Sequence, residues 1–178
     1  MMTETFDPKV IWPTFYENET IQELGKNCRW SISTNDKMPI DVPHLMATGA
    51  VRGASIREGF DQVCVDLDTL VDCIPNAANH AYHINSIVDE VIIVDIEKTC
   101  PKEQAMALLG MLPDALYAET SMSGKGYHLV MPLPESFRQW ADATTKPVLK
   151  HPEGWFELLQ RHWVTFTRNP IPEDIIAE

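Results

Sequence analysis

The sequence of 178 residues lacks the patterns of several common protein classes. Its longest aliphatic run is VIIV at 91–94, which is far too short to cross a bilayer. Glu4 and Asp7 lie where a signal peptide would carry basic residues, so we expect a cytoplasmic protein with no membrane partner. The sequence also has no P-loop, no dinucleotide-binding glycine pattern, no HExxH motif and no Ser/His/Asp order.

Basic residues are scarce. The chain has 14 Lys and Arg against 26 Asp and Glu, which gives a formal net charge of −12. This charge argues against a protein that coats nucleic acid through a broad basic face, although a local basic groove is compatible with it. Any binding to a nucleic-acid template is therefore expected to be weak, salt-sensitive or aided by a partner.

The four cysteines include no CxxC pair. Cys64, Cys73, His80 and His83 can be written as a zinc quartet, but their spacing matches no common zinc site. Free buried thiols and strand histidines are the simpler interpretation, and the zinc hypothesis stays open.

The length and the 44% apolar content predict an ordinary globular domain with a sizeable core. Residues 1–26 are acidic and irregular and are expected to form an N-terminal arm, while 27–178 form the folded domain. Strand-like and helix-like patterns intermix along 27–178, with hairpins as well as crossovers, which predicts an α+β fold. Strands are expected at 28–34, 81–85, 90–97, 116–120, 127–133 and 155–167, the last with a break near Arg161, and helices at 101–110 and 135–143.

A longer helix is predicted from Ser55 to about Ile74. Ser55 and Glu58 form a capping-box pattern, and apolar residues follow at helical spacing. This helix contains Asp66 and Asp68. Residues two apart on a helix diverge by about 200°, so these two aspartates are not expected to share a metal.

The strongest candidate site is the sequence DEVIIVDIE at 89–97. Asp95 and Glu97 follow a buried strand, and side chains two apart on a strand point the same way. Paired carboxylates of this kind suit divalent metal ions that also bind substrate phosphates. The alternative interpretation is that these acidic residues mark the end of a strand, where solvent begins.

A Ser- and Gly-rich turn follows in ETSMSGKGYHLVM at 119–131. Ser121, Ser123 and Lys125 supply hydroxyls and a cation that suit phosphate oxygens, or else they belong to a plain flexible hairpin turn. His128 lies on the strand after the turn, where it suits a triphosphate or the carboxylates. A structural histidine is the alternative.

The segment FELLQRHW at 156–163 adds two further candidates. Glu157 is either a third metal ligand or the outward residue of an amphipathic strand. Arg161 is placed where a contact to a base or a phosphate is plausible.

These elements, in this order, resemble the primase–polymerase proteins of phages and plasmids, in the archaeo-eukaryotic primase superfamily. Such proteins show an apolar strand ending in DxD or DxE, an E-x-S-x-S-G-x-G-x-H stretch, then a later carboxylate, an Arg and a T-x-T ending. The resemblance covers roughly residues 28–169. The matching residues, including a Q-W … K-x-P-like entry, are Arg29, Trp30, Lys37, Pro39, Asp95, Glu97, Glu119, Ser121, Ser123, Gly124, Gly126, His128, Glu157, Arg161, Thr165 and Thr167.

The resemblance implies a primase–polymerase catalytic core in which an RRM-like mixed or antiparallel sheet faces a second small α/β unit. It implies that Asp95, Glu97 and Glu157 bind Mg²⁺ or Mn²⁺. His128 would contact the phosphates of a nucleoside triphosphate, helped by Ser121, Ser123, Lys125 and Arg161. The expected activity is the joining of nucleotides on a single-stranded DNA template in phage or plasmid replication, within a bacterial host cytoplasm.

Three departures from the pattern are evident. Glu97 replaces the commoner second Asp, Arg168 and Asn169 stand where a Gly often ends the T-x-T-G motif, and no helicase domain follows. We therefore expect a partner such as a replicative helicase or another replication protein. Two alternatives remain open: a primase-like module that binds nucleotides or a replication protein without synthesis, and a nuclease or phosphatase that uses the same metal site.

Overall fold

The computed structural model describes residues 6–143 and 146–176, with nine α-helices, three short 3₁₀ helices and eight strands in that part of the chain. The chain folds into two units, Met1–Tyr82 and His83–Glu178. No helix in the described ranges is both long and apolar enough to span a membrane. Antiparallel strand pairing and mixed helices confirm the predicted α+β class.

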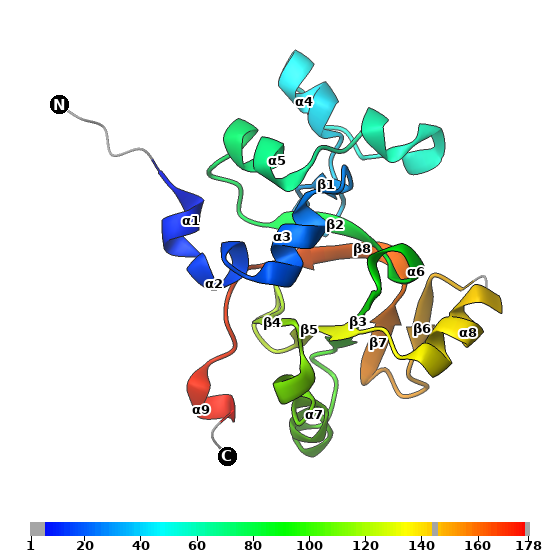
Figure 1. Cartoon of the computed structure of the whole chain (residues 1–178). Coiled ribbons are helices and arrows are strands. Elements are labelled where there is room, and N and C mark those ends of the chain that lie inside the picture. Colours follow the sequence, from blue (N-terminus) through cyan, green and yellow to red (C-terminus); the bar gives the residue numbers. More distant parts are fainter. Residues whose placement is uncertain (1–5, 144–145, 177–178) are drawn as a thin grey trace. The chain divides into compact units, whose positions relative to one another are not determined.

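The first unit consists mainly of short helices and turns (Figure 1). Its elements are α1 (Pro8–Ile11), α2 (Pro13–Tyr16), α3 (Glu19–Gly25), β1 (Trp30–Ser31), α4 (Val42–Thr48), η1 (Ile56–Glu58), η2 (Phe60–Gln62), α5 (Leu67–Cys73) and the start of β2 (His80–Asn85). β1 pairs with β2 in antiparallel orientation, with Trp30 opposite Tyr82. The three-stranded sheet to which they belong has the order β1-β2-β8.

The expectation of an irregular segment before residue 27 is wrong at the level of secondary structure, because three short helices form there. Asp7 and Asn18 cap the first and third of them through side-chain oxygens. Phe15 is fully buried, and its ring lies edge-on to the buried ring of Trp30 at 6.3 Å between centroids. These apolar contacts explain why a polar-looking segment is ordered.

The predicted helix from Ser55 to Ile74 is also wrong over its first half. The Ser55 side chain makes no capping hydrogen bond, and two 3₁₀ turns replace the helix up to Gln62. Gly59 lies between them at φ 108°, a conformation that interrupts a helix. The α-helix α5 begins only at Leu67, and the Asp66 side chain caps it by accepting a hydrogen bond from the Thr69 N–H.

The second unit is built on a five-stranded antiparallel sheet in the order β4-β5-β3-β7-β6. Its strands are β3 (Val91–Ile96), β4 (Tyr117–Thr120), β5 (Tyr127–Pro132), β6 (Val148–Lys150) and β7 (Phe156–Leu159), and β8 (Arg161–Phe166) follows β7. The helices are α6 (Ser86–Asp89), α7 (Lys102–Leu109), η3 (Leu112–Asp114), α8 (Glu135–Ala143) and α9 (Glu173–Ile176). Of the predicted elements here, the β4–β5 hairpin, α8 and the break between β7 and β8 are confirmed.

The core of the second unit fixes which face of the sheet each strand residue occupies. Val94, Ile96 and Leu129 pack with Leu109 of α7 in one buried cluster, and α7 lies against β5 and β3 (Figure 1). Neighbouring residues on a strand point to opposite faces. Asp95 and His128 therefore lie on the face away from α7.

Candidate metal and nucleotide site

Five polar residues form one row across the sheet, because the strand register places them directly opposite one another. Glu119 on β4 is opposite His128 on β5, which is opposite Asp95 on β3. Asp95 is opposite Glu157 on β7, which is opposite Lys150 on β6. Because directly opposed residues of antiparallel strands share a face, all five side chains lie on the face away from α7.

Three carboxylates converge at the middle of this row. One ligand oxygen from each of Asp95, Glu97 and Glu157 lies within 4.8 Å of the others, and all three residues are half-buried. Among the described residues they are the only group of three or more His, Cys, Asp or Glu side chains that converges in this way. A set of carboxylate oxygens suits a hard divalent cation, which takes oxygen ligands and leaves positions for substrate phosphates. The site can therefore bind a metal ion.

His128 lies between two carboxylates of the row, those of Glu119 and Asp95. Its Nδ1 lies 2.8 Å from Oε1 of Glu119, and its Nε2 lies 3.5 Å from Oδ1 of Asp95. Only 5% of its side chain is exposed. The imidazole is thus buried and oriented, with one ring nitrogen directed toward the carboxylate cluster.

Glu119 is the residue of this site whose contact the sequence reasoning missed. Its side chain is fully buried and accepts hydrogen bonds from the Tyr117 hydroxyl and from the backbone N–H groups of Thr167 and Arg168. The signal that could have revealed it was the hairpin itself. Once Thr120 and Tyr127 are recognised as the pair that closes the turn, the next pair outward must be Glu119 and His128.

The turn before His128 is internally hydrogen-bonded. The Ser121 hydroxyl lies 3.1 Å from that of Ser123 and accepts a hydrogen bond from the Gly126 N–H. Ser123 also accepts from the Lys125 N–H, and both of these residues are exposed. The two hydroxyls therefore shape the turn, and Ser123 and Lys125 remain accessible to solvent.

Gly126 fits the turn tightly against β3. A Cβ atom built on Gly126 would lie 2.4 Å from the carbonyl oxygen of Ile96 and 2.9 Å from Oγ of Ser121. Gly124, in contrast, has φ +72° and open space around it. Gly126 is required for the close approach to β3, and Gly124 for the left-handed bend.

Arg161 begins β8, after the break at Gln160 that separates it from β7. Its backbone N–H donates to the carbonyl of Pro147. Arg168, shortly after β8, adopts φ 68°, in the left-handed region that favours glycine. In this conformation the backbone N–H of Arg168 donates to Oε2 of Glu119.

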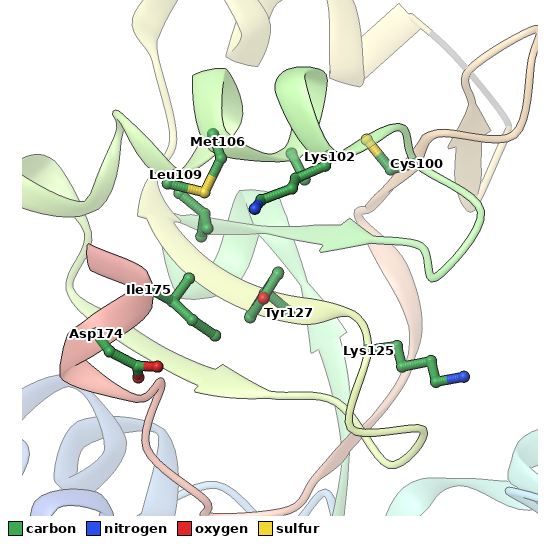
Figure 2. Close-up of a pocket in the computed structure, with 9 residues that line it drawn as sticks. Cys100, Lys102, Met106, Leu109, Lys125, Tyr127, Asp174 and Ile175 are labelled. Carbon is green, nitrogen blue, oxygen red and sulfur yellow. The ribbon is translucent and has the colours of Figure 1, made fainter. Parts of the chain in front are cut away.

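The sheet has a separate hollow on its other face. A pocket of about 380 Å³ is lined by Tyr127 and by residues of α7, the turn and α9 (Figure 2). Tyr127 precedes His128 on β5, so its side chain lies on the opposite face of the sheet. Lys125 reaches this pocket from the turn. The carboxylate cluster is not part of its lining.

The zinc hypothesis gains nothing from the described residues, since the converging group consists of the three carboxylates. Cys64 is buried and Cys73 exposed, and His80 hydrogen-bonds to the Tyr16 hydroxyl.

No protein-family model matches this chain, and no curated protein matches it.

Proposed function

We propose that this chain is a metal-dependent primase–polymerase, which joins nucleotides on a single-stranded DNA template. The observation that supports this proposal most is the convergence of Asp95, Glu97 and Glu157 within 4.8 Å, with Asp95 directly opposite His128. No side-chain nucleophile is needed for this reaction, because a 3′ hydroxyl of the substrate attacks the nucleoside triphosphate.

The proposed ligands of Mg²⁺ or Mn²⁺ are the three carboxylates. Bound cations supply positive charge for the attacking oxygen and for the departing pyrophosphate. In this proposal His128 meets the triphosphate through Nε2, and the proposed helpers are Ser123 and Lys125 on the exposed turn. Ser121 and Arg161 complete the proposed nucleotide-binding set.

The test is elongation of a primed or unprimed single-stranded template with labelled nucleotides and either metal. We expect incorporation by the wild type and its loss in Asp95→Asn and Glu97→Gln. Asp68→Asn removes the same charge at an exposed position of the other unit and serves as the matched control. A wild type that is inactive with both metals, even with a partner helicase supplied, would contradict the proposal.

The main rival is a primase-like module that binds nucleotides without synthesis. The net charge of −12 favours it, because a template of like charge is repelled. Mn²⁺-dependent binding of a triphosphate without turnover would support the module. Release of pyrophosphate supports synthesis, whereas strand cleavage or release of inorganic phosphate supports the hydrolytic alternative.

A further inference from the structure

We infer that Glu119 is a positioning residue, which fixes the hydrogen of His128 on Nδ1 and thereby turns Nε2 toward the carboxylate cluster. The inference rests on the proposed function for its purpose, which is to aim Nε2 at the phosphates of a nucleotide. Because phosphate oxygens only accept, Nε2 must carry a second hydrogen when it meets them. The physical evidence for the inference is the set of hydrogen bonds that the Glu119 carboxylate makes to His128 and to the backbone of residues 167–168.

Both carboxylate oxygens of Glu119 are occupied by groups that can only donate. The Thr167 N–H lies 2.9 Å from Oε1, and the Arg168 N–H lies 2.9 Å from Oε2. A carboxylate accepts at both oxygens, whereas the amide of a glutamine would direct its NH₂ at one of these N–H groups. The backbone at 167–168 therefore selects Glu over Gln at this position.

The same carboxylate selects the tautomer of His128. Oε1 lies 2.8 Å from Nδ1, and a carboxylate oxygen at that distance calls for an N–H on the imidazole. A carboxylate that hydrogen-bonds one ring nitrogen fixes both the tautomer and the ring orientation, as it does around metal-binding histidines. Nε2 is then the nitrogen that faces Asp95, at 3.5 Å.

Burial makes this arrangement rigid. Glu119 is fully buried and His128 is 4% exposed, so neither side chain can exchange its partner for water without moving the strands. A buried carboxylate is costly unless each of its oxygens is hydrogen-bonded. A purely structural role, in which Glu119 only ties β4 to residues 167–168, is the competing explanation.

The position of the hydrogen on His128 tests whether Glu119 fixes the tautomer. We would label the histidines with ¹⁵N, record two-bond ¹H–¹⁵N correlations of the imidazoles, and assign His128 by its loss in His128→Gln. A hydrogen on Nδ1 of the wild type, with or without a second on Nε2, supports the inference. An unprotonated Nδ1 overturns it. This measurement needs no nucleotide, so it decides the inference even if the proposed function fails.

A pair of variants tests the consequence for binding. Tyr117→Phe removes a different donor, 2.8 Å from Oε2, without touching His128, and is the matched control for Glu119→Gln. We expect Glu119→Gln to weaken Mn²⁺-dependent triphosphate binding about tenfold or more, and Tyr117→Phe to leave it nearly unchanged. Equal weakening in both, in proportion to their loss of thermal stability, would show a structural role and overturn the inference.

Discussion

Asp95 and Glu157 are direct cross-strand partners on β3 and β7, so two carboxylates lie side by side on one face of the sheet. Like charges directly opposite each other destabilise a strand pair by roughly 0.2–1 kcal/mol. We therefore expect Glu157→Gln to raise the melting temperature of the metal-free protein. The ion pair between exposed Lys150 and half-buried Glu157, at 3.8 Å, is expected to contribute little in the opposite direction.

Bound Mn²⁺ should make the wild type more stable than Glu157→Gln, the reverse of the order expected without metal. At a Mn²⁺ concentration one hundred times Kd, the wild type gains about 2.7 kcal/mol, and Glu157→Gln gains much less because one ligand is missing. Melting curves with and without Mn²⁺ measure both effects. Asp68→Asn should show the full gain, and a Glu157→Gln variant stabilised as strongly as the wild type would exclude Glu157 as a ligand.

Replacing His128 tests the proposed contact with phosphate. His128→Ala should weaken triphosphate binding by about 1.5–3 kcal/mol, the range for a hydrogen bond to a charged group, while Mn²⁺ binding is largely kept. Lys125→Ala should cost less, because an exposed ammonium is screened by solvent. Calorimetric titration measures both losses. A larger loss in Lys125→Ala would indicate that the phosphates bind at the turn and not beside His128 on the strand.

Gly126→Ala should displace the turn from β3. The added Cβ would meet the carbonyl oxygen of Ile96 at 2.4 Å, and backbone must shift to admit it. We expect a loss of about 1–3 kcal/mol in the free energy of unfolding, as for other overpacked sites. Gly124→Asn is the control, since Asn tolerates the left-handed conformation and nothing lies within 4 Å of that Cβ. Denaturant unfolding compares the two.

Asp66→Ala should lower stability without affecting nucleotide chemistry. The Asp66 carboxylate caps α5 at Thr69, and loss of such a cap costs about 0.5–2 kcal/mol. Asp68→Ala, at an exposed position of the same helix, should be nearly neutral. Urea unfolding measures the difference, and a loss of elongation activity in either variant at a temperature where it is folded would contradict the assignment of the site.

The Cys64 thiol should make stability fall at high pH. Burial, with smaller effects of Cys28 and Asp41, raises the pKa of Cys64 from 9.0 to about 12. Between these values the unfolded chain loses the thiol proton while the folded chain keeps it, so the free energy of unfolding decreases as pH rises. Well below pH 9 the thiol is protonated in both states and the effect is absent. Unfolding midpoints of the wild type should fall more steeply from pH 9 to 11 than those of Cys64→Ala.

The central part of the site was predictable because it depends on local periodicity. The alternation of residues along β3 places Asp95 and Glu97 on one side, and the turn signals around Gly124 indicate a hairpin that brings in His128. The position of Glu157 beside Asp95 was harder to predict, because the pairing of β3 with β7 joins segments far apart in sequence.

Other features depend on tertiary contacts that no short window of sequence contains. Phe15 becomes buried against Trp30, which orders a segment that looks irregular by composition. Ser55 begins a capping-box pattern, yet Gly59 and the following 3₁₀ turn delay the helix to Leu67. The role of Glu119 requires the backbone of residues 167–168, which lies 48 and 49 residues away along the chain.

The two backbone hydrogen bonds from Thr167 and Arg168 to Glu119 also determine when the site can form during translation. β4 leaves the ribosome well before residues 167–168, so its glutamate must stay hydrated until those residues emerge. Closing so long a segment carries a larger entropic cost than closing the β4–β5 hairpin. The nascent chain can pair β3 with β5 and still lack an oriented His128. We therefore expect a ribosome-bound chain to be unable to engage nucleotides until β8 and the residues after it are released.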